Sequence, residues 1–381
     1  MNSPNSAYVA EASSKRIVYT VAFRSAGSCA NRVTAHSQSS RPVEPVMSCV
    51  MRPANLRPAD AALGVDGFLT RQATRITSLL GVTHSFDRAQ HLLEQLCGWT
   101  VDSETIRRST HATARRAAAE RPMRADAGRF AAAPGEVELL IDAGKINTRV
   151  GFRDLKLALF LRRSRGKPAT VAQWASRRLP KPTIRAAVAA IEGCGLFAER
   201  VRREADRLKV TTDSRVSVLA DGAPWIWELA ADVVPQAAGV LDIFHAVENL
   251  SNAVKAIFSP GTDAAKAHTE AGRQALLAGG KAGVDRWLAD LIPRVPAGVS
   301  AEPLVGVSAY LANHPTHLDY AGRLASGRSI GSGAVEGAIK QWVNLRMKRS
   351  GARWRVENVG PFVELLAMFE TPDWTGLWTA A

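Results

Sequence analysis

The stretch Val216-Ser-Val-Leu-Ala-Asp-Gly-Ala-Pro-Trp-Ile-Trp227 predicts a short buried strand that ends at a carboxylate. Apolar and small residues lead up to Asp221, and Gly222 and Pro224 then stop the strand. The two tryptophans that follow would form a wall on one side of the carboxylate. We therefore expect Asp221 to lie at the edge of a sheet, where a functional site can form.

Two further acidic residues have related settings. Val137-Glu-Leu-Leu-Ile141 leads directly into Asp142, and Glu336 lies in a glycine-rich entry to a helix at 330–341. If Asp142, Asp221 and Glu336 converge, they form a catalytic set of oxygen ligands for hard divalent cations. Two Mg²⁺ or Mn²⁺ ions bound by carboxylates can activate an attacking hydroxyl and stabilise a leaving oxygen in phosphodiester chemistry.

The overall charge of the chain favours a polyanionic partner. The 381 residues include 49 Lys and Arg against 35 Asp and Glu, which gives a net charge of +14. Such a charge indicates nucleic acid or an anionic membrane. No apolar run approaches the ~18 residues that span a bilayer, so the sequence favours DNA over a membrane. The four cysteines lack Cys-x-x-Cys spacing, which indicates neither a zinc cluster nor a disulfide framework and fits the cytoplasm.

The N-terminal part predicts a tail and a helical DNA-binding domain. Residues 1–58 show no helical or strand periodicity, which predicts a disordered tail, and residues 60–130 predict helices. A helix-turn-helix at about 85–110 would use Ser85 as a cap and Gly98 as the turn. An ordinary helical hairpin is the alternative. The polar and basic residues suited to phosphates and base edges are Ser103, Thr105, Arg107 and Arg108.

The remainder predicts an α/β catalytic core, at 136–258 and 324–370, that is interrupted by a helical insertion at 259–323. Strands are expected at 137–146, 155–161, 175–179, 216–220 and 239–241, with helices from Thr183 and over 242–257. Three strands, a helix, a strand, a helix and a strand is the element order of the ribonuclease-H-like fold. The insertion is expected to lie over the active site, because Asp221 and Glu336 must meet across it.

Several motifs resemble bacterial insertion-sequence transposases of the DDE class, within the Mutator-like superfamily and closest to the ISKra group. The similarity covers about 65–369, and its most specific pieces are Ile141-Asp-Ala-Gly-Lys-Ile-Asn-Thr148, Ala220-Asp-Gly-Ala-Pro-Trp225 and Gly331-Ser-Gly-Ala-Val-Glu336, with Met347–Trp354. The resemblance implies a catalytic triad of Asp142, Asp221 and Glu336. Asp242-Ile-Phe-His245 resembles the Asp/Cys-x-x-His motif of that superfamily.

From these features we expect a transposase that binds the terminal inverted repeats of its element and target DNA as a homo-oligomer, in the bacterial cytoplasm at the nucleoid. His245 is either a packing residue or an accessory residue that orients DNA or the carboxylates. A ribonuclease-H-like nuclease without transposition, and a DNA-binding regulator or inactive remnant, are the alternatives. Basic residues expected to grip the DNA backbone after the third acid are Lys340, Arg346, Lys348, Arg349 and Arg353.

Overall fold

A computed structural model describes residues 31–33, 46–48 and 69–379, and the chain divides into two compact units. One unit combines the chain up to Arg116 with residues 372–381, and the other runs from Ala117 to Thr371. Two short strands, β1 (Asn31–Val33) and β2 (Val46–Ser48), pair antiparallel within the predicted tail. The rest of the predicted tail 1–58 lies outside the described residues.

The first unit is helical, as the sequence predicts. The Ser85 side chain accepts a hydrogen bond from the Arg88 backbone at 3.3 Å, which confirms the predicted cap, and Gly98 takes a left-handed conformation with φ of 66°. Ala89 and Leu93 are fully buried between these helices. The helices are α2 (Arg71–Thr83), α3 (Phe86–Cys97), α4 (Ser103–Glu120), which continues into the second unit, and α14 (Asp373–Thr379).

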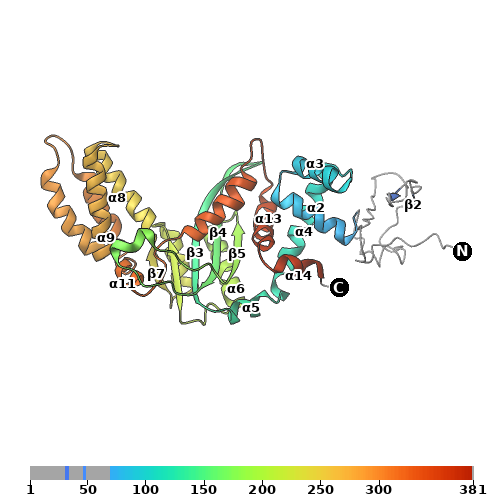
Figure 1. The fold of residues 1–381 in the computed structure, drawn as a ribbon, viewed down its shortest axis with the longest axis horizontal. Coiled ribbons are helices and arrows are strands. Elements are labelled where there is room, and N and C mark those ends of the chain that lie inside the picture. The colour runs from blue at the N-terminus through green and yellow to red at the C-terminus, as the bar shows by residue number, and fades with distance from the viewer. Residues whose placement is uncertain (1–30, 34–45, 49–68, 380–381) are drawn as a thin grey trace. The chain divides into compact units, whose positions relative to one another are not determined.

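The second unit is built on a mixed five-stranded sheet with the order β5-β4-β3-β6-β7 (Figure 1). The first three strands along the chain pair antiparallel, whereas β6 runs parallel to β3 and β7 runs parallel to β6. The predicted α/β class is therefore confirmed. The strands are β3 (Glu136–Thr148), β4 (Gly151–Arg163), β5 (Ile184–Ala190), β6 (Val216–Ala220) and β7 (Ala238–Leu241).

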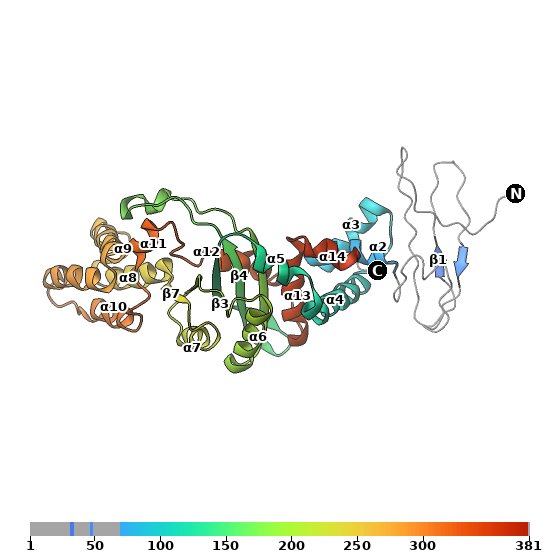
Figure 2. The same cartoon turned by 90° about the horizontal axis from the view of Figure 1, so that it is seen from below.

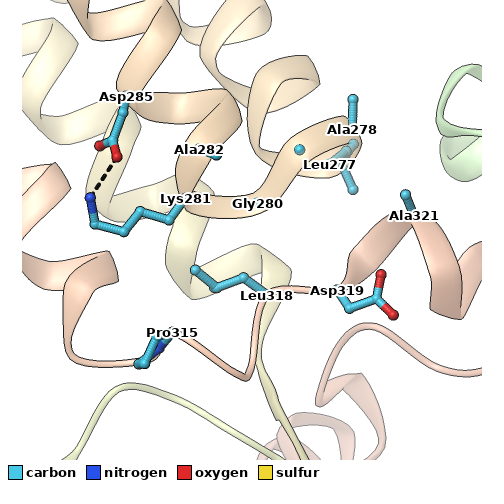
Figure 3. Close-up of a pocket in the computed structure, with 11 residues that line it drawn as sticks. Leu277, Ala278, Gly280, Lys281, Ala282, Asp285, Pro315, Leu318, Asp319 and Ala321 are labelled. Atoms are coloured by element: carbon cyan, nitrogen blue, oxygen red, sulfur yellow. Dashed lines mark hydrogen bonds and ion pairs between the residues drawn. The ribbon is translucent and has the colours of Figure 1, made fainter.

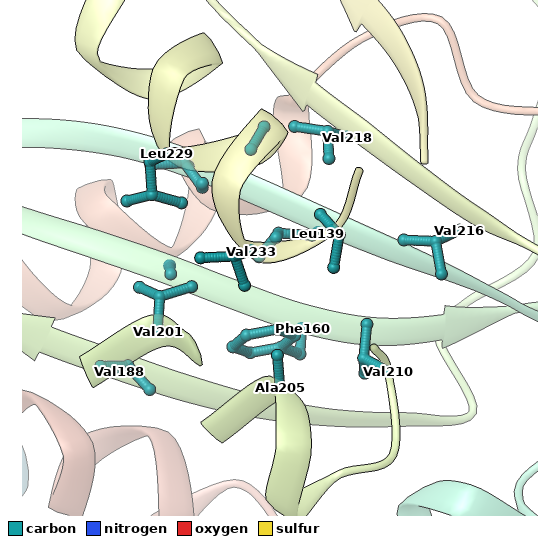
Figure 4. Close-up of a cluster of buried hydrophobic side chains, with 14 of the residues drawn as sticks. Leu139, Phe160, Val188, Val201, Ala205, Val210, Val216, Val218, Leu229 and Val233 are labelled. Atoms are coloured by element: carbon teal, nitrogen blue, oxygen red, sulfur yellow. The ribbon is translucent and has the colours of Figure 1, made fainter. Parts of the chain in front are cut away.

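Helices cover both faces of this sheet. On one face, α6 (Cys194–Arg207) and α7 (Pro224–Val233) bury Val201 and Leu229 against Leu139 and Phe160 of the strands (Figure 4). On the other face, the segment that carries the third acid packs against β3, β4 and β5. It consists of α12 (Gly333–Ala338), the π-helix η5 (Ile339–Met347) and α13 (Val356–Phe369).

The structure corrects the predicted third strand. Residues 175–179 belong partly to a 3₁₀ turn, η3 (Val171–Ser176), and the strand is β5, where the sequence predicted the start of a helix. β5 pairs with β4 along its length, so hydrogen bonding to the sheet overrides the helix propensity of its alanines. The helix predicted from Thr183 therefore begins later, at Cys194.

The helical region predicted over 60–130 is also interrupted near its end. α4 ends at Glu120 and is followed by the 3₁₀ turn η2 (Arg121–Met123) and by α5 (Asp126–Ala132). Pro122 lacks a backbone N–H and cannot continue a helix from the preceding turn.

Residues 259–323 contain helices that lie with α8 (Ile243–Phe258) beyond the β7 edge of the sheet (Figures 1 and 2). They are α9 (Asp263–Leu291), η4 (Ile292–Arg294), α10 (Glu302–Ala312) and α11 (Tyr320–Ala325). α9 is kinked at Gly280, whose φ of 52° suits glycine, and a Cβ there would lie 3.0 Å from the Leu318 carbonyl oxygen. A pocket of about 530 Å³ borders this kink (Figure 3). No helix in the described ranges is both long and apolar enough to cross a membrane.

A buried arginine ties together the elements at the β5 edge. Arg121 lies 2.9 Å from Glu204 of α6 and 3.0 Å from Glu364 of α13, and it donates to the Ala187 carbonyl of β5 at 2.7 Å. Burial opposes its charge, but the two carboxylates still raise the pKa of Arg121 above its ordinary value. Through Arg121, η2 is joined to α6, α13 and β5.

We expect Arg121→Ala to destabilise the protein by about 3–5 kcal/mol, because it leaves the buried Glu364 without its ion-pair partner, whereas Glu204 keeps Arg207 at 2.7 Å. Urea unfolding measures this change. Arg202→Ala is the matched control, because Arg202 pairs with Asp232 at an exposed position, and its loss should leave the unfolding midpoint nearly unchanged. Equal midpoints for the two variants would contradict the structural role of Arg121.

Candidate active site

Pairing of β3 with β6 places the first two acids side by side. Ile141 is the register partner of Ala220 in the parallel ladder, so Asp142 and Asp221 follow at the same level. Val137, Leu139 and Ile141 belong to the core under α6 and α7, and side chains alternate along a strand. Asp142 therefore faces the opposite side of the sheet, where Ile339 of η5 lies within 3.3 Å of a Cβ built at Gly144. Glu336 lies in α12, directly before η5.

Backbone groups hold these two acids in place. Asp142 Oδ1 accepts from the Ala143 backbone N–H at 2.6 Å, and Asp221 Oδ1 accepts from Ala223 at 2.9 Å. The indole N–H of Trp227 donates to the Asp221 carbonyl oxygen at 2.9 Å, which places this tryptophan beside the acid. Burial, and then the charge of Asp221, raise the pKa of Asp142 above its ordinary value of 3.8.

A third carboxylate reaches the same edge from β7. The Asp242 backbone N–H donates to the Ala220 carbonyl at 2.7 Å, which aligns the end of β7 with the end of β6. Asp242 is fully buried and caps α8, where its Oδ1 accepts from the Phe244 backbone at 2.7 Å. Its other oxygen accepts from the Ser332 backbone N–H at 3.0 Å and from the Ser332 hydroxyl.

Ser332 connects this buried acid to Glu336. The Ser332 hydroxyl, which donates to Asp242, lies 2.9 Å from Glu336 Oε1. Burial, and then contact with Asp242, raise the pKa of Glu336 above 4.5. One ligand atom each from Asp242, His245 and Glu336 lies within 4.8 Å of the others. The structure thus places the Asp242–His245 motif against the third acid.

The predicted triad occupies two adjoining parts of one constellation. Asp142 lies beside Asp221, and Glu336 lies beside Asp242 and His245. The negative charge of Asp242 raises the pKa of both Asp142 and Glu336, which joins the two parts. Asp242 therefore lies among the predicted acids, close to Glu336. Its resemblance to the Asp/Cys-x-x-His motif had indicated an accessory position at the site. Ser332 was missed, although its spacing of four residues before Glu336 puts both on one side of a helical turn.

These acids have a charge that suits a divalent cation. In residues 69–379, no Lys or Arg forms an ion pair with Asp142, Asp221, Asp242 or Glu336. Repulsion between carboxylates contributes to the raised pKa values of Asp142 and Glu336. Clustered carboxylate oxygens without a basic partner are the donor set that Mg²⁺ and Mn²⁺ prefer. The residues present therefore fit such ions.

An open pocket of about 470 Å³ is lined by Asp221 and by His245 of the acid cluster. Tyr310 of α10 reaches it, and a Cβ at Gly222 would lie 2.5 Å from the tyrosine hydroxyl, so only glycine allows this approach. Burial, and then the charge of Asp221, raise the pKa of Tyr310 to about 12. No local sequence pattern predicts that Tyr310 lies beside Asp221, because the residue comes from the helical segment 259–323.

The proposed DNA-contacting residues of α4 lie close to an acidic residue. Glu104 forms ion pairs with Arg107 at 2.5 Å and Arg108 at 3.0 Å, and its pKa falls to about 2. The Thr105 hydroxyl donates to Asp102 at 2.6 Å, and the Ser103 backbone N–H donates to the Gln90 side chain. The arginines are thus ordered on the helix surface, with part of their charge compensated.

Basic residues after Glu336 divide into exposed and buried groups. Arg346 is only 5% exposed, and its guanidinium lies 4.8 Å from the centre of the Phe362 ring. Burial, and then Arg349, lower its pKa to about 9. This corrects the expectation that Arg346 grips DNA, because its charge packs η5 against α13. The residues that remain exposed are Lys340, Lys348, Arg349 and Arg353.

Trp342 and Trp354 lie among these basic residues in the sequence. They are 2% and 6% exposed, and the Trp354 indole donates to the Met347 carbonyl at 2.9 Å. Both rings are therefore part of the core.

No model of a known protein family matches this sequence, and no curated protein matches it. The resemblance to insertion-sequence transposases therefore stays a prediction.

Removal of the Ser332 hydroxyl tests the connection between Asp242 and Glu336. We expect Ser332→Ala to lower the free energy of unfolding by about 1–3 kcal/mol, because a buried carboxylate loses a donor. Ser176→Ala is the control, since its hydroxyl bonds a carbonyl at an exposed turn. Urea unfolding compares the two variants, and an unchanged stability of Ser332→Ala would show that the contact is not significant.

Proposed function

We propose that this protein is a DDE transposase that binds the ends of its insertion sequence and catalyses metal-dependent DNA cleavage and strand transfer. The observation that carries the proposal is the placement of Asp142 and Asp221 on adjacent parallel strands, on the side of the sheet from which Glu336 approaches. Their lack of basic partners in the described part of the chain supports a metal-binding role over a structural one.

The strand order supports a ribonuclease-H-like core. The strands β3, β4 and β5 form an antiparallel meander, and β6 and β7 then extend the sheet in parallel on the β3 side. The first acid lies on the first of these strands and the second lies just past the fourth, as the resemblance implies. Helices flank both faces, and the third acid enters on a later helix.

Asp142, Asp221 and Glu336 would hold two Mg²⁺ or Mn²⁺ ions. Such ions activate a water or a 3′-hydroxyl and stabilise the departing oxygen of the scissile phosphodiester. The protein itself supplies the positions of these carboxylates. Backbone donors fix Asp142 and Asp221, and Ser332 with the buried Asp242 fixes Glu336. His245 lies close enough to orient Glu336.

The charge distribution supports DNA as the substrate. The net charge of +14 attracts the phosphate backbone, and the exposed residues Lys340, Lys348, Arg349 and Arg353 follow the third acid. We assign recognition of the terminal inverted repeats to α3 and α4. We also propose that the protein acts as a homo-oligomer on element and target DNA, in the bacterial cytoplasm at the nucleoid.

Replacement of any one of Asp142, Asp221 and Glu336 by Ala should abolish cleavage and joining, because each supplies ligand oxygens. Binding to the element ends should stay within about twofold, since affinity for DNA comes mainly from Lys and Arg. The assay uses the DNA that flanks the coding region, with Mg²⁺ or with EDTA. Asp154→Ala removes an exposed carboxylate from β4 and should retain activity.

Full cleavage by Asp221→Ala would refute the assignment of the site. Cleavage by the wild type without any joined product would favour a nuclease that does not transpose, and end binding without cleavage would favour a regulator.

Replacement of Arg107 and Arg108 together by Ala should weaken binding to element ends by about tenfold or more. Each lost phosphate contact should also reduce the salt dependence of log K by about 0.9. Fluorescence anisotropy at several salt concentrations measures both effects. Arg202→Ala is the matched control, because this exposed arginine is likewise paired with a carboxylate. Unchanged end binding by the double variant would place recognition outside α4.

A further inference from the structure

The open pocket beside Asp221 shares Asp221 and His245 with the acid cluster, and its other polar residues have no part in the proposed catalytic chemistry. One wall is a face of α8, with His245, Glu248, Asn249 and Asn252, and Tyr310 of α10 lies on another wall. Residues three, four and seven positions apart lie on one side of a helix, so the α8 residues form a continuous surface. Asp221 borders both this pocket and the acid cluster.

The charge of the lining disfavours direct contact with a phosphate group that no cation bridges. Among the described residues that border the pocket none is Lys or Arg, whereas Asp221 and Glu248 are carboxylates. A second anion would be repelled there. The part of a DNA strand that suits this pocket is therefore uncharged, namely a base or a sugar.

The available hydrogen-bonding groups favour a base. Asn249 and Asn252 carry carboxamides that form no other hydrogen bond in the described part of the chain, and Glu248 can accept from an amino group. Carboxamides pair with adenine, and carboxylates accept from the amino group of cytosine. The Tyr310 hydroxyl stays protonated at neutral pH and can donate, and its ring offers an aromatic surface for a base.

The wall that carries Tyr310 is firmly supported. Trp227, which donates to the Asp221 carbonyl, stacks on His317 with ring centres 4.1 Å apart. His314 lies 5.6 Å from the Tyr310 ring and 5.6 Å from the Trp227 ring. The pocket is thus formed before any ligand binds, which lowers the entropy cost of binding.

We propose that this pocket binds an unpaired nucleobase with an exocyclic amino group, from the nucleotide next to the phosphate that is cut. The inference rests on the proposed function, because a phosphate at Asp142 and Asp221 brings the neighbouring nucleotide of the same strand to the pocket. The phosphate is then held by cations at the acids, and the base is held by Asn249, Asn252 and Tyr310.

The test uses the full-length protein and labelled hairpin duplexes that carry a five-nucleotide single-stranded 3′ overhang. The overhang is oligo-adenosine, oligo-thymidine or abasic, and anisotropy in Ca²⁺ buffer measures the affinity. The wild type should bind the adenosine overhang about tenfold more tightly than the other two, because thymine has no exocyclic amino group. Asn249→Ala with Asn252→Ala should remove this preference and leave abasic binding unchanged.

Two further variants sharpen the comparison. Tyr310→Phe keeps the ring and should lose only part of the preference, whereas Asn313→Ala removes an exposed carboxamide outside the pocket and should retain it. Equal wild-type affinity for all three overhangs, or a double variant with the full preference, would overturn the pocket and leave the transposase proposal standing. A wild type that binds none of the duplexes and cuts no DNA would overturn both.

Discussion

The parallel register between β3 and β6 is the constraint on which the whole site depends. Ile141 pairs with Ala220, and both side chains enter the core beneath α6 and α7. A slip of one residue in either strand would turn its apolar side chains away from that core and move its acid to the other face. The burial of ordinary hydrophobic residues therefore fixes the position of Asp142 and Asp221, which are themselves only half-buried.

Packing, and not mutual attraction, holds the acids together. Burial and like charges raise the pKa of Asp142 and of Glu336, so their ionised forms oppose the folded arrangement. Asp242 tolerates complete burial because it accepts from two backbone N–H groups and from the Ser332 hydroxyl. Elsewhere in the same unit, buried carboxylates have arginine partners, as Glu204 does. This contrast separates the acid cluster, for which we propose bound cations, from a structural ion network.

The sequence predicted the parts of this arrangement that depend on local pattern. A strand through Asp142 and a strand that ends just before Asp221 were evident from apolar runs, and Ser85 was evident as a helix cap. The strand at Ile184–Ala190 was missed because its alanines favour a helix in isolation, and only pairing with β4 makes it a strand. The burial of Arg346 and the approach of Tyr310 depend on contacts between distant segments, which no local pattern records.

Asp221 borders both the acid cluster and the open pocket, and the helical segment after β7 contributes Tyr310 to that pocket. Phosphates need cations, which the carboxylates at the strand ends can bind. Bases need neutral donors and acceptors, which the exposed face of α8 and Tyr310 of α10 provide. Because glycine at position 222 leaves room for Tyr310, the turn after β6 carries Asp221 and also lets the tyrosine line the pocket. The segment 259–323 therefore does more than connect the second acid to the third, since its Tyr310 adds a wall to the pocket that we propose binds a nucleobase.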